Sequence, residues 1–108
     1  MNKARILIVD DEVEIRELLS RNFRMRGFNV ELAGNGREAL AILDEKRVDV
    51  VVSDIMMPEM DGTTLLRAIR QHYPMIRVIM MTGYVTQENA LTCMRLGAQT
   101  CIFKPFVD

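Results

Sequence analysis

Three aspartates follow two hydrophobic runs of this sequence, and their placement could support chemistry. Asp10 and Asp11 come directly after the run at 5–9, and Asp54 comes directly after the run at 49–53. If both runs are buried parallel strands, their carboxyl ends lie at one edge of the sheet, where open α/β folds bind ligands. Two carboxylates about 5 Å apart repel by roughly 3 kcal/mol at an effective dielectric near 20. A divalent metal ion would offset this repulsion, so the pattern predicts a metal site.

Two more hydrophobic runs end in polar groups that would reach the same edge. Thr82 follows the run at 77–81, and Lys104 follows the run at 100–103. Carboxylate oxygens and water suit Mg²⁺, which usually shares its coordination shell with a phosphate oxygen. A metal, an ammonium group and a hydroxyl around one aspartate predict a site for phosphoryl transfer.

Asp54 is the better candidate for the acceptor of a phosphoryl group. It stands alone at a strand end near the centre of the predicted crevice, whereas the adjacent Asp10 and Asp11 are suited to hold the ion. The added negative charge of an acyl phosphate could be neutralised by the metal and by Lys104, while Thr82 could donate a hydrogen bond to a phosphoryl oxygen.

The elements that must position these residues are predicted by the alternation of apolar runs with stretches of helical period. This alternation is typical of repeated βα units with a mostly parallel sheet. The predicted strands are 5–9, 28–32, 49–53, 77–81 and 100–103. The first, third and fourth runs are almost unbroken aliphatic or Met sequences, as expected for buried central strands. The run at 28–32 alternates apolar and polar residues, which favours the edge of the sheet.

Four stretches between the runs place apolar residues three and four positions apart, which predicts helices with one buried stripe. The stripes are Ile15, Leu18, Leu19 and Phe23; Ala39, Leu40 and Leu43; Leu65, Leu66, Ile69 and Tyr73; and Ala90, Leu91 and Met94. Gly27, Gly62 and Gly97 mark helix boundaries, and Pro74 ends the third helix. Right-handed crossovers cover both sheet faces if the chain reverses direction once, which gives the doubly wound, flavodoxin-like order 2-1-3-4-5. The reversal lies between the two strands that precede the aspartates.

The composition is that of one globular domain over residues 1–108. A hydrophobic fraction of 49% with 27% charged residues argues against a disordered chain and against a membrane protein. A formal net charge of −1 without a run of like charges disfavours direct contact with nucleic acid. Cys93 and Cys101 lack the companions of a zinc site or a disulfide framework. The N-terminus lacks the pattern of a secretory signal, so we expect a cytoplasmic protein.

Several motifs, in their order and spacing, resemble the response-regulator receiver domain of two-component signalling. They are Asp10-Asp11-Glu12, Asp54-Ile55-Met56-Met57-Pro58-Glu59-Met60-Asp61-Gly62, Thr82-Gly83 and Lys104-Pro105. The resemblance covers nearly the whole chain and implies a signalling switch, not an enzyme, with a histidine kinase and a downstream effector as partners.

The resemblance also assigns roles to individual residues. It implies that Asp54 accepts the phosphoryl group and that Thr82 and Lys104 contact it. It implies that Asp10, Asp11 and Asp54 bind Mg²⁺, together with the main-chain carbonyl of Met56.

Two features depart from the family pattern. The family usually has an aromatic residue three positions before the Lys-Pro pair, and Cys101 stands there instead. The usual aromatic switch is therefore not expected here. The chain also stops at Asp108, where a fifth helix would normally start, so we expect this sequence to come from a longer protein. An uncovered apolar face at that place would favour a homodimer or another partner.

Three other interpretations of these residues stay open at this stage. Asp10 and Asp11 could simply cap the first helix, because Asp is favoured there. The segment 34–39, Gly34-Asn35-Gly36-Arg37-Glu38-Ala39, fits a loose dinucleotide-binding fingerprint with Asp54 as a ribose ligand, although it follows the second strand and not the first. A metal-dependent phosphatase with an aspartate nucleophile would need a second acid two residues later, where Met56 stands. His72, at the end of the third predicted helix, is expected at the surface.

Overall fold

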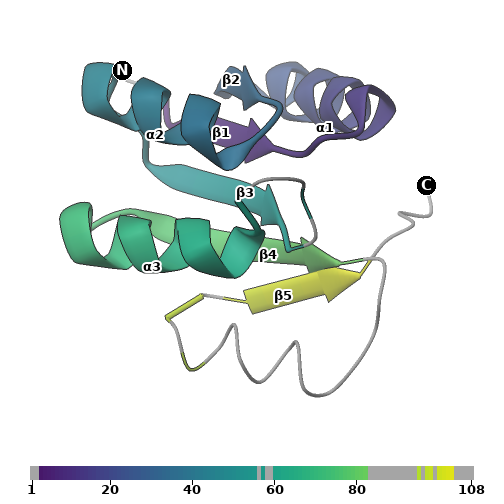
Figure 1. The fold of residues 1–108 in the computed structure, drawn as a ribbon. Helices are drawn as coiled ribbons and strands as arrows, with labels where there is room; N and C mark the ends of the chain where they lie inside the picture. Colours follow the sequence, from purple (N-terminus) through teal and green to yellow (C-terminus); the bar gives the residue numbers. More distant parts are fainter. Residues whose placement is uncertain are drawn as a thin grey trace.

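Five parallel strands form a single sheet in the computed structural model, which describes residues 3–55, 57, 60–82, 95, 97, 98 and 100–103, with the backbone alone at 82 and 100–103. The strands are β1 (Arg5–Val9), β2 (Asn29–Ala33), β3 (Val50–Asp54), β4 (Arg77–Thr82) and β5 (Thr100–Phe103). Their order is β2-β1-β3-β4-β5, and every neighbouring pair is parallel (Figure 1). The predicted flavodoxin-like order and the edge position of the second strand are confirmed.

Three strands differ from the prediction by one residue: β2 and β3 are each shifted one residue later in the sequence, and β4 ends at Thr82. β2 begins at Asn29 because the Phe28 N–H donates to the Phe23 carbonyl oxygen at 3.1 Å, in the turn after the first helix. β3 continues through Asp54, which is in register with Met81 of β4. Asp54 is therefore the last residue of its strand and not the first residue after it.

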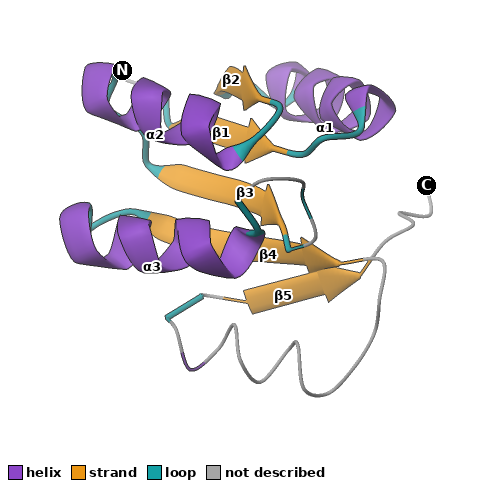
Figure 2. Cartoon of the chain, viewed as in Figure 1, coloured by secondary structure: helices purple, strands orange, loops and turns teal. Residues whose placement is uncertain are grey.

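The described helices lie on both faces of the sheet (Figures 1 and 2). They are α1 (Val13–Met25), α2 (Gly36–Glu45) and α3 (Gly62–His72). The larger core cluster joins one face of the sheet to α2 and α3, and the smaller joins the other face to α1. The helix expected around Ala90 and Leu91, and any structure after Phe103, lie outside the described residues.

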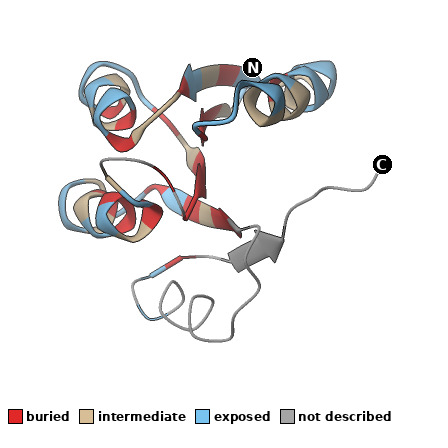
Figure 3. Ribbon diagram, turned by 45° about the vertical axis from the view of Figure 1, so that its right-hand side comes forward, coloured by how far each residue is buried: buried red, intermediate tan, exposed pale blue. Residues whose placement is uncertain are grey.

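The alternation of side chains along β1 explains the two cores. Leu7 and Val9 point into the cluster with α2 and α3, whereas Ile6 and Ile8 point into the cluster with α1. Because both faces are covered, Leu7, Ile8 and Val9 are fully buried, which accounts for the unbroken apolar run. Figure 3 shows the same pattern, with buried residues in the central strands and exposed residues on the outer sides of the helices.

The residues at the ends of the helices are of types that favour these positions. Asn35 caps α2 by accepting a hydrogen bond from the Glu38 N–H at 2.9 Å. Gly27, after α1, and Gly97 have φ angles of 93° and 100°, which favour glycine. His72 is exposed at the end of α3, as predicted. Within the described ranges, none of the helices combines the length and apolar character needed to cross a bilayer.

Candidate functional site

The carboxyl ends of β1 and β3 bring Asp10 and Asp54 together. The two strands are neighbours at the centre of the sheet, and Val9 is paired with Ser53. Asp10 and Asp54 each come next in their chains, so both lie at the same edge of the sheet. The crevice predicted from the strand order is therefore the place where these two carboxylates meet.

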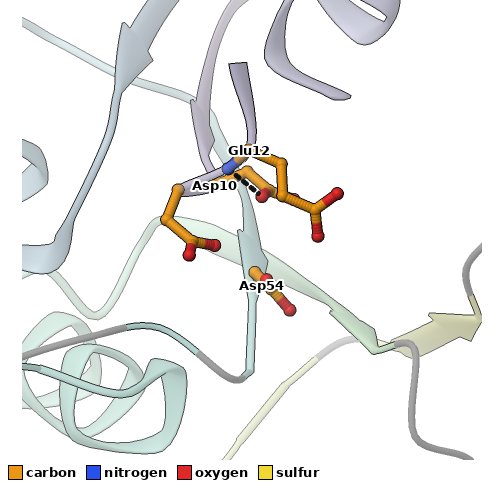
Figure 4. Close-up of side chains that lie close together, drawn as sticks. Asp10, Glu12 and Asp54 are labelled. Carbon is orange, nitrogen blue, oxygen red and sulfur yellow. Dashed lines mark hydrogen bonds between the residues drawn. The ribbon is translucent and has the colours of Figure 1, made fainter. Parts of the chain in front are cut away.

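Four carboxylates converge at this edge. Asp10, Asp11, Glu12 and Asp54 each present a carboxylate oxygen, and these oxygens all lie within 4.8 Å of one another. Asp10 and Asp54 are buried, with 0% and 4% of their surface exposed, whereas Asp11 and Glu12 are exposed. Figure 4 shows Asp54 from β3 beside Asp10 and Glu12 from the segment that joins β1 to α1. We call these four residues the acidic cluster.

Hydrogen bonds fix Asp10 on several sides. Its N–H donates to the Ala33 carbonyl oxygen at 3.1 Å, and its Oδ1 accepts from the Glu12 N–H at 2.8 Å. Its main-chain oxygen accepts from Arg16 Nη1 at 2.6 Å. The N-cap residue of α1 is Glu12, which makes no side-chain capping bond. The interpretation of Asp10 and Asp11 as simple helix caps is thus not supported by the geometry.

The chain behind Asp54 folds back closely because Gly62 has no side chain. The Gly62 N–H donates to the Ile55 carbonyl oxygen at 2.7 Å. A Cβ atom on Gly62 would lie 2.2 Å from the main-chain oxygen of Asp54 and 2.7 Å from Met80 Cε. The Ile55 N–H donates to the Met81 carbonyl oxygen at 2.9 Å, so both peptide groups of Ile55 are hydrogen-bonded. Gly62 therefore sets how closely α3 approaches the strand end that carries Asp54.

The other predicted site residues are only partly located. Thr82 is the last residue of β4, in register with Phe103 of β5, so β4 ends beside β3 and β5 ends beside β4, at the predicted edge of the sheet. Lys104 and Met56 lie outside the described residues. Glu12 belongs to the acidic cluster but was not predicted as a ligand, although its position directly after Asp10 and Asp11 was a signal for it.

The cluster offers only oxygen ligands, and this donor set fits a hard divalent cation. Mg²⁺ and Ca²⁺ bind carboxylate oxygens, whereas zinc and copper sites are usually built from nitrogen and sulfur ligands. Two buried carboxylates a few ångströms apart also repel each other strongly, which adds to the attraction for a cation.

The segment 34–39 is occupied by contacts of its own. The Gly34 N–H donates to Glu38 Oε1 at 2.8 Å, and Asn35 caps α2. A Cβ atom on Gly36 would lie 2.5 Å from Met60 Sδ, so the Met60 side chain packs directly on this glycine. The N–H group and the open space that a dinucleotide phosphate needs are already used, which disfavours the nucleotide-binding interpretation.

Residues 6–108 match the model of the response regulator receiver domain. The chain belongs to the response regulator receiver domain family. It is 46% identical over 102 residues to the regulatory protein AtoC of Escherichia coli, an alignment that covers 94% of this chain and 22% of AtoC. The receiver domain thus spans less than a quarter of that relative.

Solved structures show the same fold. The chemotaxis protein CheY4 of Vibrio cholerae superposes with a TM-score of 0.93 at 35% identity, over 98% of this chain and 90% of CheY4. A response regulator from Burkholderia pseudomallei, described with a phosphorylated aspartic acid and a calcium ion, gives a TM-score of 0.90 at 25% identity, over 97% and 62% of the two chains. The receiver domain is a regulatory domain of a signalling protein.

Proposed function

We propose that this receiver domain is a switch operated by phosphorylation of Asp54. The observation that carries the proposal is the meeting of two buried carboxylates, Asp10 and Asp54, in a cluster whose oxygens lie within 4.8 Å of one another. In this proposal Asp10, Asp11 and Asp54 hold Mg²⁺ with the main-chain carbonyl of Met56. The Thr82 hydroxyl and the Lys104 ammonium contact the phosphoryl group.

The geometry favours Asp54 over Asp10 as the acceptor. Asp10 is held by bonds to its N–H, its main-chain oxygen and its Oδ1, and it has no exposed surface. A phosphoryl group on Asp10 would have to fit beside a side chain that has no exposed surface. Asp54 closes the central strand β3, beside the ends of both β1 and β4. A group attached there can be reached from both neighbouring strand ends.

The chemistry follows from the side chains. An Asp54 carboxylate oxygen forms a bond to the phosphorus of a phosphohistidine on the kinase, while the phosphorus–nitrogen bond breaks and the imidazole nitrogen takes up a proton. When bound, Mg²⁺ supplies positive charge to the phosphoryl oxygens. Asp10 and Asp54 would orient the reacting centre because both lie at the carboxyl ends of buried strands.

Phosphorylation changes the charge at the edge of the sheet and thereby shifts an equilibrium between two forms of the domain. We propose that residues 1–108 form one receiver domain, that a histidine kinase donates the phosphoryl group, and that the output belongs to another part of a longer cytoplasmic protein. Apart from its own phosphorylation and dephosphorylation, the domain would catalyse no turnover. A homodimer through an apolar face is compatible with this scheme.

Mass spectrometry of the intact chain tests the proposal. Treatment with a small acyl-phosphate donor should add one phosphoryl group when Mg²⁺ is present and none when it is chelated. Asp54→Asn should abolish the gain, whereas Glu17→Gln, an exposed change on α1, should leave it intact. Phosphorylation of Asp54→Asn at the wild-type level would contradict the assignment. Sustained phosphate release from small phosphomonoesters would instead indicate a phosphatase.

A further inference from the structure

Arg16 connects α1 to the strand end that carries Asp10. It lies in the first turn of α1, where its N–H donates to the Glu12 carbonyl oxygen at 3.1 Å. Its half-buried side chain turns back toward β1, and Nη1 donates to the Asp10 main-chain oxygen at 2.6 Å. A guanidinium donor gives a charge-assisted bond, which is stronger than a bond between neutral groups.

The same guanidinium also packs against the turn between β2 and α2. A Cβ atom on Gly34 would lie 3.1 Å from Arg16 Nη1 and 3.5 Å from Glu38 Oε1. The turn is itself fixed, because the Gly34 N–H donates to Glu38 Oε1 at 2.8 Å. Gly34 leaves the room that the Arg16 side chain occupies, so the guanidinium lies between two segments at the carboxyl edge of the sheet.

Asp10 is therefore held by both of its peptide groups. Its N–H is bonded to the Ala33 carbonyl oxygen at 3.1 Å, and its own carbonyl oxygen is bonded to Arg16. With both neighbouring peptide planes fixed, the direction in which the Asp10 carboxylate leaves the backbone is fixed as well. In metal sites, groups that orient a ligand contribute to affinity without touching the ion.

We propose that Arg16 is a positioning residue for the acidic cluster, which it orders for Mg²⁺ through the main chain of Asp10. The inference rests on the proposed function, because it assumes that the cluster binds Mg²⁺. It assigns to Arg16 a role in cation affinity and not only in the packing of α1.

Two effects of Arg16 on a bound cation have opposite signs. Its positive charge repels Mg²⁺, whereas its hydrogen bond orders a ligand for Mg²⁺. The charge is half-exposed, and water weakens interactions of exposed charges. The hydrogen bond is short, and it acts directly on Asp10, a ligand with no exposed surface. The positioning effect is therefore the larger one, and removal of Arg16 weakens Mg²⁺ binding.

Calorimetric titration of the folded chain with Mg²⁺ alone tests whether removal of Arg16 weakens Mg²⁺ binding. Arg16→Gln, which is too short to reach the Asp10 carbonyl oxygen, should raise the Mg²⁺ dissociation constant by about tenfold. Arg16→Lys keeps a charged donor and should recover part of the affinity. Arg21→Gln removes the same charge from an exposed site on the same helix and should bind Mg²⁺ like the wild type.

Gly34→Ala provides a second perturbation if Arg16→Gln does not fold. Its Cβ would lie 3.1 Å from Nη1 and push the guanidinium by a few tenths of an ångström, so Mg²⁺ affinity should fall, but by less than in Arg16→Gln. Unchanged affinity in the folded Arg16→Gln or Gly34→Ala chain, or tighter binding by Arg16→Gln, would overturn the inference. An equal loss in Arg21→Gln would overturn it too, because the loss would then not depend on the hydrogen bond to the Asp10 main chain. A wild-type chain that binds no Mg²⁺ would instead refute the proposed function.

Discussion

Replacement of Asp54 by Asn should make the metal-free domain more stable, although it alters a buried residue. The carboxylate oxygens of Asp54 and Asp10 lie within 4.8 Å of each other, and both residues are almost completely buried. At that separation and an effective dielectric of 20, their repulsion is about 3 kcal/mol. Asn has nearly the same volume as Asp, so the change leaves no cavity, and its amide can donate to a neighbouring carboxylate. After allowance for screening by other groups, we expect a net gain of about 2 kcal/mol.

Urea unfolding with a chelator and then with saturating Mg²⁺ measures this effect. Without the cation, Asp54→Asn should unfold at a higher urea concentration than the wild type. With Mg²⁺ at about 100 times its dissociation constant, the wild type should gain about 2.7 kcal/mol, and the variant should gain much less. Glu17→Gln removes an exposed carboxylate and should shift stability by less than about 0.5 kcal/mol. A metal-free Asp54→Asn chain less stable than the wild type would refute the argument from repulsion.

Three further changes test the backbone contacts and the helix cap. Gly62→Ala should cost about 2 kcal/mol or more in urea unfolding and should weaken Mg²⁺ binding, because its Cβ would lie 2.2 Å from the main-chain oxygen of Asp54. Gly27→Ala, at a φ of 93° with nothing within 4 Å, should cost about 1 kcal/mol from backbone strain and leave Mg²⁺ binding unchanged. Asp61 is the N-cap of α3. Hydrogen bonds from the Thr63 hydroxyl and from the Thr64 N–H lower the pKa of Asp61 below its ordinary value of 3.8. The stabilisation from Asp61 is thus present above pH 3.8 and is lost as the pH falls through the folded-state pKa. Asp61→Asn should therefore flatten the pH dependence of urea unfolding below about pH 4, and an unchanged profile would contradict this.

The sheet could be predicted from the sequence because its central strands are buried on both faces. That burial accounts for the unbroken apolar runs at 5–9 and 49–53, and the alternation of apolar and polar residues at 28–32 indicates a strand at the edge of the sheet. The strand order then follows from the handedness of the crossovers, and it places Asp10 beside Asp54. The hydrophobic pattern of the sequence could therefore predict the positions that the regular geometry of strands fixes.

Contacts that depend on the path of loops were not predicted. Glu12 joins the acidic cluster because the Asp10 carboxylate binds the Glu12 N–H, and no periodicity encodes that turn. The proposed role of Arg16 and the role of Gly62 depend on side-chain reach and on the closeness of two backbones, which no apolar pattern encodes. The one-residue shift of β3 has a different origin, because pairing with β4 continues past the apolar run to the polar residue Asp54.

The stability of this domain and its function draw on the same interactions. Leu7, Val9 and Val51 are fully buried, so the two central strands lie in the packed core, and they hold the two carboxylates close together. A site on a mobile loop could relax its carboxylates apart, and it would then lose much of its attraction for a cation. In the sheet the two carboxylates stay close together, so an added positive charge or a change to Asp54 acts on both of them. The core of the fold thus keeps the edge of the sheet sensitive to charge, which is the property that a phosphorylation switch requires.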